Sequence, residues 1–133
     1  MMATALRLEP VYNELRELVK NSYYVMADET PHPVLENDRP GSLHRGYMWN
    51  FYLPLSKTPF FEYHQGRGST GIDTLIEGNV KVVQSDGFVV YDTFDSLNDR
   101  LHLCCWAHVR RKFVEAEGSD PPRARHALDR IKK

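Results

Sequence analysis

The sequence of 133 residues predicts an α/β fold with a mixed sheet of five strands and flanking helices. Three strand-like segments follow one another in the first half, which favours an antiparallel meander. Two later strand-like segments are separated by a helical pattern, which favours parallel strands joined by crossover connections. We therefore expect three antiparallel strands extended by two parallel additions.

A helix is expected at the N-terminus, within residues 1–22. Pro10 suits the first turn of such a helix, and Asn21 with Ser22 suits its end. Apolar residues recur at helical spacing, at Leu8, Val11, Tyr12, Leu15, Leu18 and Val19. The other positions are mostly polar, so one side of this helix is suited to solvent.

The three consecutive strands are rich in aromatic and β-branched residues and are expected at 23–27, 46–53 and 59–64. The second and third are expected to form a hairpin around a turn at 54–58. The first is expected to end at Asp28, because Pro31 and Pro33 cannot donate hydrogen bonds in a central ladder. The polar stretch 36–42 is expected to be a loop.

The second half is expected to alternate between helices and strands. The expected short elements are a helix at 71–76, a strand at 80–84, a helix or loop at 91–97 and a strand at 101–105. A longer helix is expected at 106–117, with one face formed by Trp106, Val109, Phe113 and Ala116. A final helix begins with the cap Asp120 and the first-turn proline Pro121.

The composition excludes several classes of protein. Hydrophobic residues make up 41% and charged residues 26%, which is typical of a globular chain and not of a disordered one. No apolar run approaches the ~18–20 residues that cross a bilayer, so no membrane partner is expected. The only cysteines, Cys104 and Cys105, are adjacent and cannot build a disulfide framework. We therefore expect a cytoplasmic protein.

Charge is distributed unevenly along the chain. Residues 1–100 contain 9 Lys and Arg against 14 Asp and Glu, whereas residues 101–133 contain 8 against 4. A basic tail on an acidic body indicates a polyanionic partner or a partner chain. A solvated helical face explains the same charges, and charge alone favours that explanation.

Asp28 and Asp86 are the most informative candidate site residues. Each follows an apolar strand, and sites in open α/β sheets collect where strands end. If the two strands are neighbours, the carboxylates converge and favour a hard divalent cation, Mg²⁺ or Mn²⁺. Two such ions ~4 Å apart activate a water or hydroxyl and stabilise the leaving oxygen in phosphodiester cleavage. The alternative is that both are turn residues, since Asp86-Gly87 is a typical turn pair.

A second candidate element is the Cys-x-x-His spacing of Cys105 and His108, followed by Arg110, Arg111 and Lys112. This spacing supplies half of a zinc site, but the other ligands are missing from the sequence. A packing role or a place in the wall of an active site is therefore favoured. The three basic residues suit DNA phosphates, and a solvated helix face is an equal alternative.

The glycine-rich stretch 66–71 lacks the Lys-Ser/Thr ending of a phosphate-binding P-loop. It would still place Arg67 near a DNA phosphate, so Arg67 joins the candidate DNA-binding residues.

Three segments of the chain, 27–31, 84–91 and 105–113, resemble the central part of IS66-family transposases, in the family's order and with similar spacing. The resemblance implies a ribonuclease H-like fold with a DDE catalytic core. Such cores use three acids to hold two Mg²⁺ ions, cleave DNA at transposon ends and join the 3′-hydroxyl to target DNA. By motif, the first acid is Asp28 and the second is Asp86, while Cys105 and His108 match the family's core motif.

The third acid of the family is a downstream Glu in an Asn-Asn-x-x-Glu-Arg context, and no such motif occurs up to Lys133. Glu115 and Glu117 lie too early to match it. We therefore expect an N-terminal helix (1–22), an incomplete core (23–118) and a truncated final helix (119–133) of a transposase fragment that is inactive alone.

The implied partners are transposon-end and target DNA, within the cytoplasm of a bacterium, and a homo-oligomer is implied by analogy. Two other functions stay open. One is a non-catalytic remnant that binds DNA or a partner chain. The other is a nuclease of RNA–DNA hybrids, against which the Cys-x-x-His element with its arginines argues.

Overall fold

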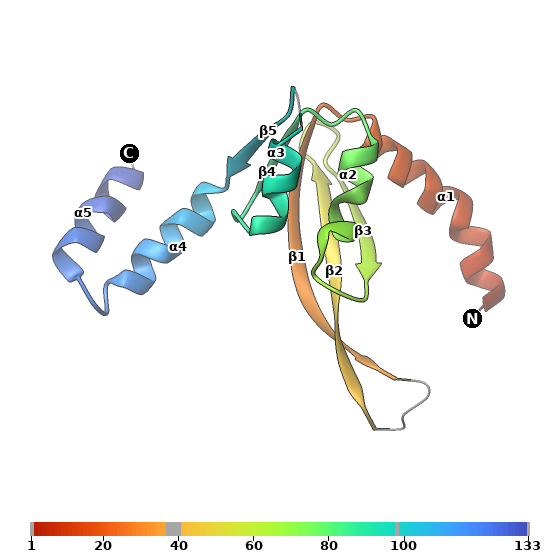
Figure 1. The fold of residues 1–133 in the computed structure, drawn as a ribbon, viewed down its shortest axis with the longest axis horizontal. Coiled ribbons are helices and arrows are strands. Elements are labelled where there is room, and N and C mark those ends of the chain that lie inside the picture. Colours follow the sequence, from red (N-terminus) through yellow and green to blue (C-terminus); the bar gives the residue numbers. More distant parts are fainter. Residues whose placement is uncertain (1, 37–40, 98, 133) are drawn as a thin grey trace.

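The computed structural model describes residues 2–36, 41–97 and 99–132 (Figure 1). Three consecutive strands follow an N-terminal helix, and helical segments then separate the last two strands. The elements are α1 (Met2–Lys20), β1 (Tyr24–Leu35), β2 (Leu43–Leu53), β3 (Thr58–His64), the 3₁₀ turn η1 (Ser69–Ile72), α2 (Asp73–Glu77), β4 (Val82–Ser85), the 3₁₀ turn η2 (Val89–Tyr91), α3 (Asp92–Asp95), β5 (Leu101–Cys104), α4 (Trp106–Ala116) and α5 (Pro121–Ile131).

The five strands form one mixed sheet in the order β3-β2-β1-β4-β5. β1, β2 and β3 pair antiparallel, whereas β4 and β5 add in parallel beyond β1. The predicted arrangement of three antiparallel strands with two parallel additions is therefore confirmed. In the register, Met26 lies opposite Tyr52 on one side and Gln84 on the other, and Asp28 lies opposite Asn50.

β1 is longer than the sequence predicts. It continues through Pro31 and Pro33 to Leu35, so the prediction that the strand ends at Asp28 is wrong. The physical reason is that β1 pairs with β4 only as far as Met26. Beyond that point the strand pairs, among the described residues, with β2 alone, and prolines are tolerated where no ladder hydrogen bond is required. β1 and β2 project together as a two-stranded ribbon (Figure 1). Residues 37–40 of the predicted loop lie outside the described residues.

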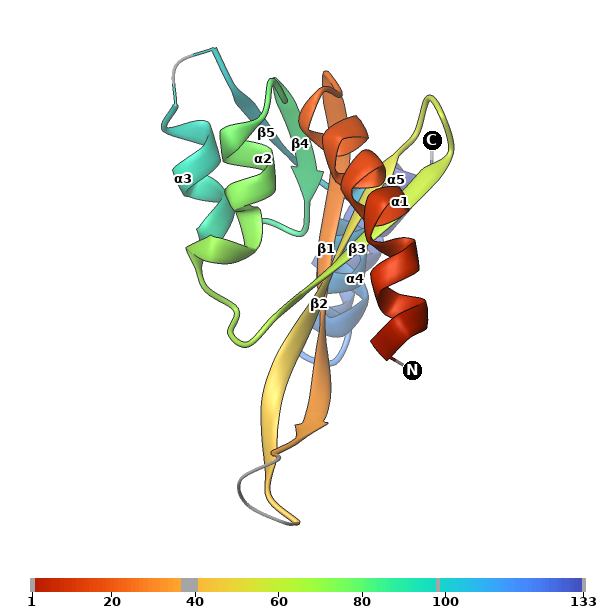
Figure 2. The same cartoon turned by 90° about the vertical axis from the view of Figure 1, so that its right-hand side faces the viewer.

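The helices α2 and α3 cover one face of the sheet (Figure 2). The core lies between this face and the two helices. Alternate side chains of the strands point to this face and are buried. The sheet contributes Val25, Ala27, Trp49, Phe51, Leu53, Phe60 and Val83. The covering segments contribute Ile72, Leu75, Val90, Tyr91 and Phe94. We call the opposite side, which carries Met26, Asp28, Asn50, Tyr52 and Gln84, the open face; its side chains are half-buried or exposed.

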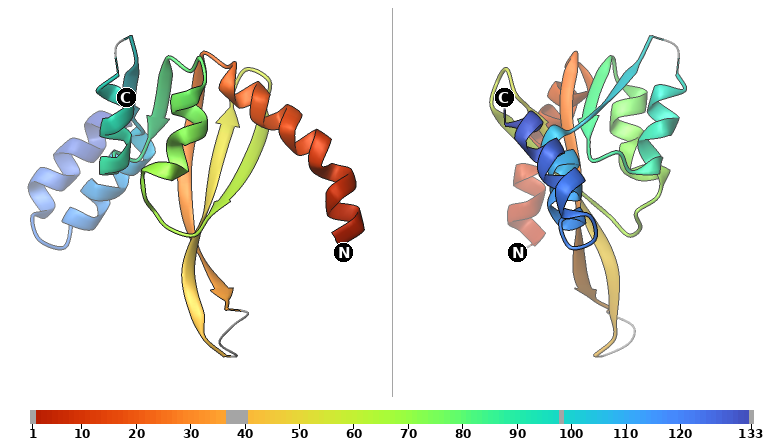
Figure 3. Two further views of the ribbon diagram at one scale, coloured as in Figure 1. Left: turned by 45° about the vertical axis from the view of Figure 1, so that its right-hand side comes forward. Right: turned by 90° about the vertical axis from the view of Figure 1, so that its left-hand side faces the viewer.

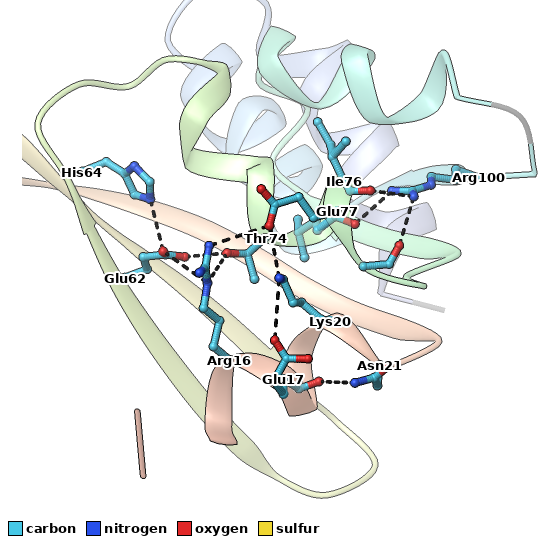
Figure 4. Close-up of polar contacts among 12 residues, drawn as sticks. Arg16, Glu17, Lys20, Asn21, Glu62, His64, Thr74, Ile76, Glu77 and Arg100 are labelled. Atoms are coloured by element: carbon cyan, nitrogen blue, oxygen red, sulfur yellow. Dashed lines mark hydrogen bonds and ion pairs between the residues drawn. The ribbon is translucent and has the colours of Figure 1, made fainter. Parts of the chain in front are cut away.

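Polar contacts fix α1 and α2 against the sheet (Figure 4). The buried Thr74 hydroxyl donates to Glu62 Oε2 at 2.8 Å and accepts from Arg16 Nε at 3.1 Å. The Arg100 guanidinium donates to three carbonyl oxygens at the end of α2, those of Leu75, Ile76 and Gly78. These carbonyls have no partners within the helix, so Arg100 satisfies the C-terminal end of α2.

One expectation for the helices is corrected. Pro10 lies inside α1 and not in its first turn, because the helix already begins at Met2. The predicted helix at 106–117 is present as α4, which buries none of its residues, so Trp106, Val109, Phe113 and Ala116 are exposed or half-buried. α4 packs mainly against α5, and the pair stands beyond β5, away from α2 and α3 (Figure 3).

The start of α5 agrees with the sequence. Asp120 caps the helix by accepting a hydrogen bond from Arg123 N, and Pro121 is the first helical residue. Ala124 and Leu128 are buried. Within the described ranges, no helix is sufficiently long and apolar to traverse a bilayer.

Candidate functional site

Asp28 lies on β1 at the point where the pairing with β4 has ended. Its neighbours Ala27 and Glu29 point to the covered face and are buried, whereas Asp28 points to the open face and is exposed. Its Oδ1 accepts a hydrogen bond from the backbone N–H of Glu29 at 3.1 Å. The carboxylate therefore reaches solvent beside the parallel half of the sheet.

Asp86 directly follows β4 and stands in a tight turn. Its Oδ1 accepts a hydrogen bond from Phe88 N at 2.9 Å, and Gly87 has the positive φ of 82° that glycine adopts without strain. Its Oδ2 lies 3.8 Å from Arg67 Nη2. One carboxylate oxygen thus forms the turn, and the other faces a cation.

Glu29 is a buried carboxylate that the sequence analysis did not single out as a site residue. Arg67 donates to its Oε1 through Nε at 2.8 Å and also through Nη2, and Tyr91 donates to its Oε2 at 3.1 Å. Burial raises the pKa of Glu29 above its ordinary value, while the hydrogen bond and charge of Arg67 act in the opposite direction. The only signal in the sequence was its position next to Asp28. In a strand, neighbouring residues face opposite sides of the sheet, so Glu29 faces away from Asp28.

Arg67 is the cation of this cluster. Its guanidinium lies 3.7 Å from the centre of the Phe88 ring, between Glu29 and Asp86. Burial alone would lower the pKa of Arg67, but the hydrogen bond and charge of Glu29, together with Asp86, outweigh it and raise the pKa. The side chain proposed for DNA phosphate therefore neutralises two carboxylates, and it remains 39% exposed.

Tyr91 is the second hydrogen-bond donor to Glu29. It is fully buried, and burial is the largest cause that raises its pKa. The negative charges of Glu29, Asp86 and Asp28 raise this pKa further. The Tyr91 hydroxyl is therefore held in its neutral form, in which it donates to Glu29.

The donor chemistry of Asp28 and Asp86 fits a hard divalent cation, which prefers carboxylate oxygens. The number of ligands is small: within residues 2–36, 41–97 and 99–132 no group of three His, Cys, Asp or Glu side chains is placed to hold a metal ion. The described residues thus offer two carboxylates, with Arg67 as a competing cation beside one of them.

The Cys-x-x-His element meets Asp28 at a cavity of about 270 Å³ at the open face. Cys105 precedes α4 and His108 lies in its first turn, so the turn into α4 brings both to the sheet. The cavity is lined by Met26, Ala27, Asp28, Asn50, Tyr52, Gln84, Ser85, Cys105 and His108. The element is therefore part of a cavity wall next to Asp28.

The basic residues Arg110, Arg111 and Lys112 are exposed on α4. Lys112 Nζ lies 3.0 Å from Glu115 Oε2, an exposed pair that contributes little to stability. These residues lie on the helix pair that stands beyond β5, outside the lining of the cavity.

The sheet topology defines an α/β protein with a mixed five-stranded sheet in the described ranges, with Asp28 and the Cys-x-x-His element at one cavity. The family described as "Transposase IS66 family" matches residues 1–133, and the chain belongs to this family.

Two further comparisons show what the chain is similar to. "Uncharacterized protein y4qI" of Sinorhizobium fredii is 27% identical over 124 residues, which is 81% of this chain and 22% of that protein. The chain thus spans about a fifth of the length of this curated relative. The cryoEM structure of the simian T-cell lymphotropic virus intasome in complex with PP2A regulatory subunit B56 gamma aligns with a TM-score of 0.43. The identity is 14%, over 77% of this chain and 44% of that one.

Proposed function

We propose that this chain is the part of a DDE-type transposase core that carries the first two metal-binding carboxylates, in a ribonuclease H-like fold. In the complete protein this core cleaves DNA at transposon ends and transfers the strand to target DNA. The observation that carries the proposal is that Asp28 on β1 and Asp86, directly after β4, come from neighbouring parallel strands. Membership of the IS66 transposase family supports the same function.

Asp28 and Asp86 would hold Mg²⁺ or Mn²⁺ through their carboxylate oxygens. Such a cation, when bound, activates a water or 3′-hydroxyl and stabilises a leaving oxygen. Arg67 neutralises Asp86 and Glu29, which lowers the repulsion among the acids before a cation arrives. Tyr91 orients Glu29 by its hydrogen bond and keeps that carboxylate on the covered face.

The proposal assigns the parts of the chain different roles. It divides the chain into an N-terminal helical part (1–22), the portion of the catalytic core (23–118) and a C-terminal helical part (119–133). Arg110, Arg111 and Lys112 would contact DNA phosphates, since they are exposed on a helix that packs mainly against α5.

The test is a calorimetric titration of the chain with Mn²⁺. We expect Asp28→Asn and Asp86→Asn each to weaken binding by about tenfold or more, because each removes one charged ligand. Asp129→Asn, on the exposed side of α5, is the matched control and should bind like the wild type. Equal affinity in all four proteins, with unfolding curves that show each is folded, would contradict the metal-binding role.

A second candidate is a non-catalytic protein that binds DNA or a partner chain, including a second copy of itself. Two observations favour it: α4 buries none of its residues, and the described segments hold no three-ligand metal group. DNA binding in the presence of EDTA, with a steep dependence on salt and no Mn²⁺ binding, would favour this candidate.

A further inference from the structure

The strand pairing that brings β1 and β4 together ends before the two predicted acids. The last paired residues are Met26 on β1 and Gln84 on β4. Asp28 and Asp86 each lie two residues further along the chain. Among the described residues, the parallel ladder of these two strands therefore does not reach the acids. The relative position of the two carboxylates is left to contacts other than this ladder.

Glu29 supplies such contacts from the position next to Asp28. Its side chain is fully buried, and both of its carboxylate oxygens accept hydrogen bonds. Arg67 donates to Oε1 through Nε at 2.8 Å and also through Nη2, and Tyr91 donates to Oε2 at 3.1 Å. Tyr91 lies in η2, so its hydrogen bond joins β1 to the segment that begins with Asp86 after β4.

Arg67 makes a second connection to that segment. Its guanidinium lies 3.7 Å from the centre of the Phe88 ring, and its Nη2 lies 3.8 Å from Asp86 Oδ2. The second distance is longer than a hydrogen bond, so the contact is an electrostatic attraction that does not use Oδ2 as an acceptor. The other oxygen of Asp86, Oδ1, accepts from Phe88 N at 2.9 Å. The carboxylate is thus fixed to the turn that Arg67 contacts.

These contacts form a closed circuit around Glu29. Tyr91 N donates to Phe88 O at 3.0 Å, which links the residue beneath Arg67 to the second donor of Glu29. Hydrogen bonds to a charged group are stronger than those between neutral groups, and two donors on one planar guanidinium also restrict its orientation. Glu29 and Arg67 together therefore hold β1 and the turn after β4 in one arrangement.

We propose that Glu29 and Arg67 are positioning residues that fix the turn after β4 against β1. By doing so, they set where the Asp86 carboxylate stands relative to Asp28. The inference deepens the proposed function and rests on it for its purpose, because a cation shared by two carboxylates needs them at a fixed separation. Neither positioning residue is a metal ligand in this proposal, since each acts through the turn that carries Asp86.

The first experiment measures amide exchange by NMR on the full chain, in the presence of EDTA. Arg67→Lys keeps the positive charge but loses the planar group that donates twice to Glu29. We expect the amides of Phe88 and Tyr91 to exchange about tenfold faster in this variant, while amides of β2 and β3 keep their wild-type rates. Arg45→Lys makes the same change at an exposed position on β2 and should alter none of these rates.

The pattern of exchange separates positioning from a general effect on stability. A pair that only stabilises the whole fold would accelerate the amides of the turn and of the central strands together. Wild-type exchange at both Phe88 and Tyr91 in Arg67→Lys, or equal acceleration throughout the sheet, would overturn the proposal.

The second experiment titrates the same proteins with Mn²⁺ at a temperature where each is folded. Residues that orient metal ligands typically change affinity by about tenfold or more, so we expect about tenfold weaker binding by Arg67→Lys and by Glu29→Gln. The combined variant should lose little beyond either single change, because both act through one contact. Glu14→Gln, at an exposed position on α1, is the control for Glu29→Gln. A purely electrostatic effect would leave Arg67→Lys unchanged, since lysine carries the same charge.

The two experiments distinguish a failure of this proposal from a failure of the proposed function. Weaker Mn²⁺ binding by Asp28→Asn and Asp86→Asn, with wild-type binding by Arg67→Lys, would mean that the acids bind metal and that the positioning role is wrong. Absence of Mn²⁺ binding by the wild type, with faster exchange of the turn in Arg67→Lys, would contradict the metal site and support the positioning of the turn.

The wild-type protein decides the question if Arg67→Lys does not fold. We expect the Nε proton of Arg67 to exchange at least about tenfold more slowly than that of the exposed Arg45, because it is held by the buried carboxylate of Glu29. Nitrogen-15 NMR of the arginine side chains measures both rates. Equal rates would show that the contact between Arg67 and Glu29 is not maintained in solution, and would overturn the proposal.

Discussion

Asp28 and Glu29 are consecutive acids whose surroundings differ because alternate residues of a strand face opposite sides of the sheet. Asp28 is exposed at the open face, whereas the Glu29 side chain is fully buried with Arg67 and Tyr91. The Asp28 carboxylate faces solvent, and the Glu29 carboxylate holds Arg67 and Tyr91 by hydrogen bonds. A shift of the strand by one residue would exchange the two roles.

The raised pKa of Glu29 predicts a pH dependence of stability. Burial makes the folded protein bind this proton more tightly than the unfolded chain, so Glu29 favours folding most below the ordinary pKa of 4.5. That contribution is lost as the pH rises through the raised pKa. We expect the free energy of unfolding of Glu29→Gln to fall less steeply with pH above 4.5 than that of the wild type.

Urea unfolding at a series of pH values measures this difference. Glu14→Gln changes an exposed glutamate on α1 and should keep the wild-type slope. Parallel curves for the wild type and Glu29→Gln would show that Glu29 has the same pKa in the folded and unfolded states.

The segment η1 and the helix α2 cover the sheet at a point where the backbone of Gly71 lies close to the ring of Trp49. A side chain at Gly71, in the turn η1, would place its Cβ 2.1 Å from ring carbons of Trp49. Trp49 is fully buried at the centre of β2 and has no room to move. The close packing of η1 on the sheet is therefore strained by any side chain at position 71.

Gly71→Ala is expected to destabilise the protein by about 1–3 kcal/mol, since the extra methyl group overpacks the core. Thermal or urea unfolding measures the loss. Gly66→Ala is the matched control, because a Cβ there meets no atom within 4 Å. A Gly71→Ala protein as stable as Gly66→Ala would show that η1 can shift away from Trp49 at little cost.

The sequence predicted the elements well where local pattern and pairing agree. The three antiparallel strands and the parallel additions follow from aromatic strands, a short turn and helical connections. Prediction from the sequence failed where contacts with other parts of the chain determine the bounds of an element. The prolines of β1 were interpreted as an end of the strand, but β1 lacks a neighbour there on the β4 side, so no hydrogen bond is missing.

In the candidate site too, the local sequence predicts some residues, whereas others are recognised only from the folded structure. Asp86 could be named from its place directly after an apolar strand, and Asp28 from the apolar run that precedes it, although β1 continues through Asp28. Glu29 could not, because the face that an acid occupies is set only when the strand has paired. Asn50 gave no signal, since a single polar residue in an aromatic strand has many explanations, and its place in the cavity wall appears only in the packed structure.

At the scale of the whole molecule, stability is unevenly distributed. The core lies between the sheet, α2 and α3, whereas α4 buries no residue and packs mainly against α5. Helices with few buried contacts open at low free energy. We expect backbone amides of α4 to exchange with solvent at least about tenfold faster than those of β1 and β2 in the sheet.

Hydrogen exchange followed by mass spectrometry on the full chain tests this expectation. Peptides from α1 provide an internal comparison, since that helix buries Val19 against the body. Protection of α4 equal to that of the central strands would mean that the helix pair is covered in solution, as expected if a second molecule binds there.

The ribbon of β1 and β2 has a consequence for behaviour at high concentration. A strand with one free edge can pair with a strand of another molecule, and this is a common route to aggregation. Pro31 and Pro33 lie in β1 beyond its pairing with β4, where that edge is free. Because neither can donate a backbone hydrogen bond, the two prolines make this edge a poor template for a foreign strand and help to keep the molecules separate.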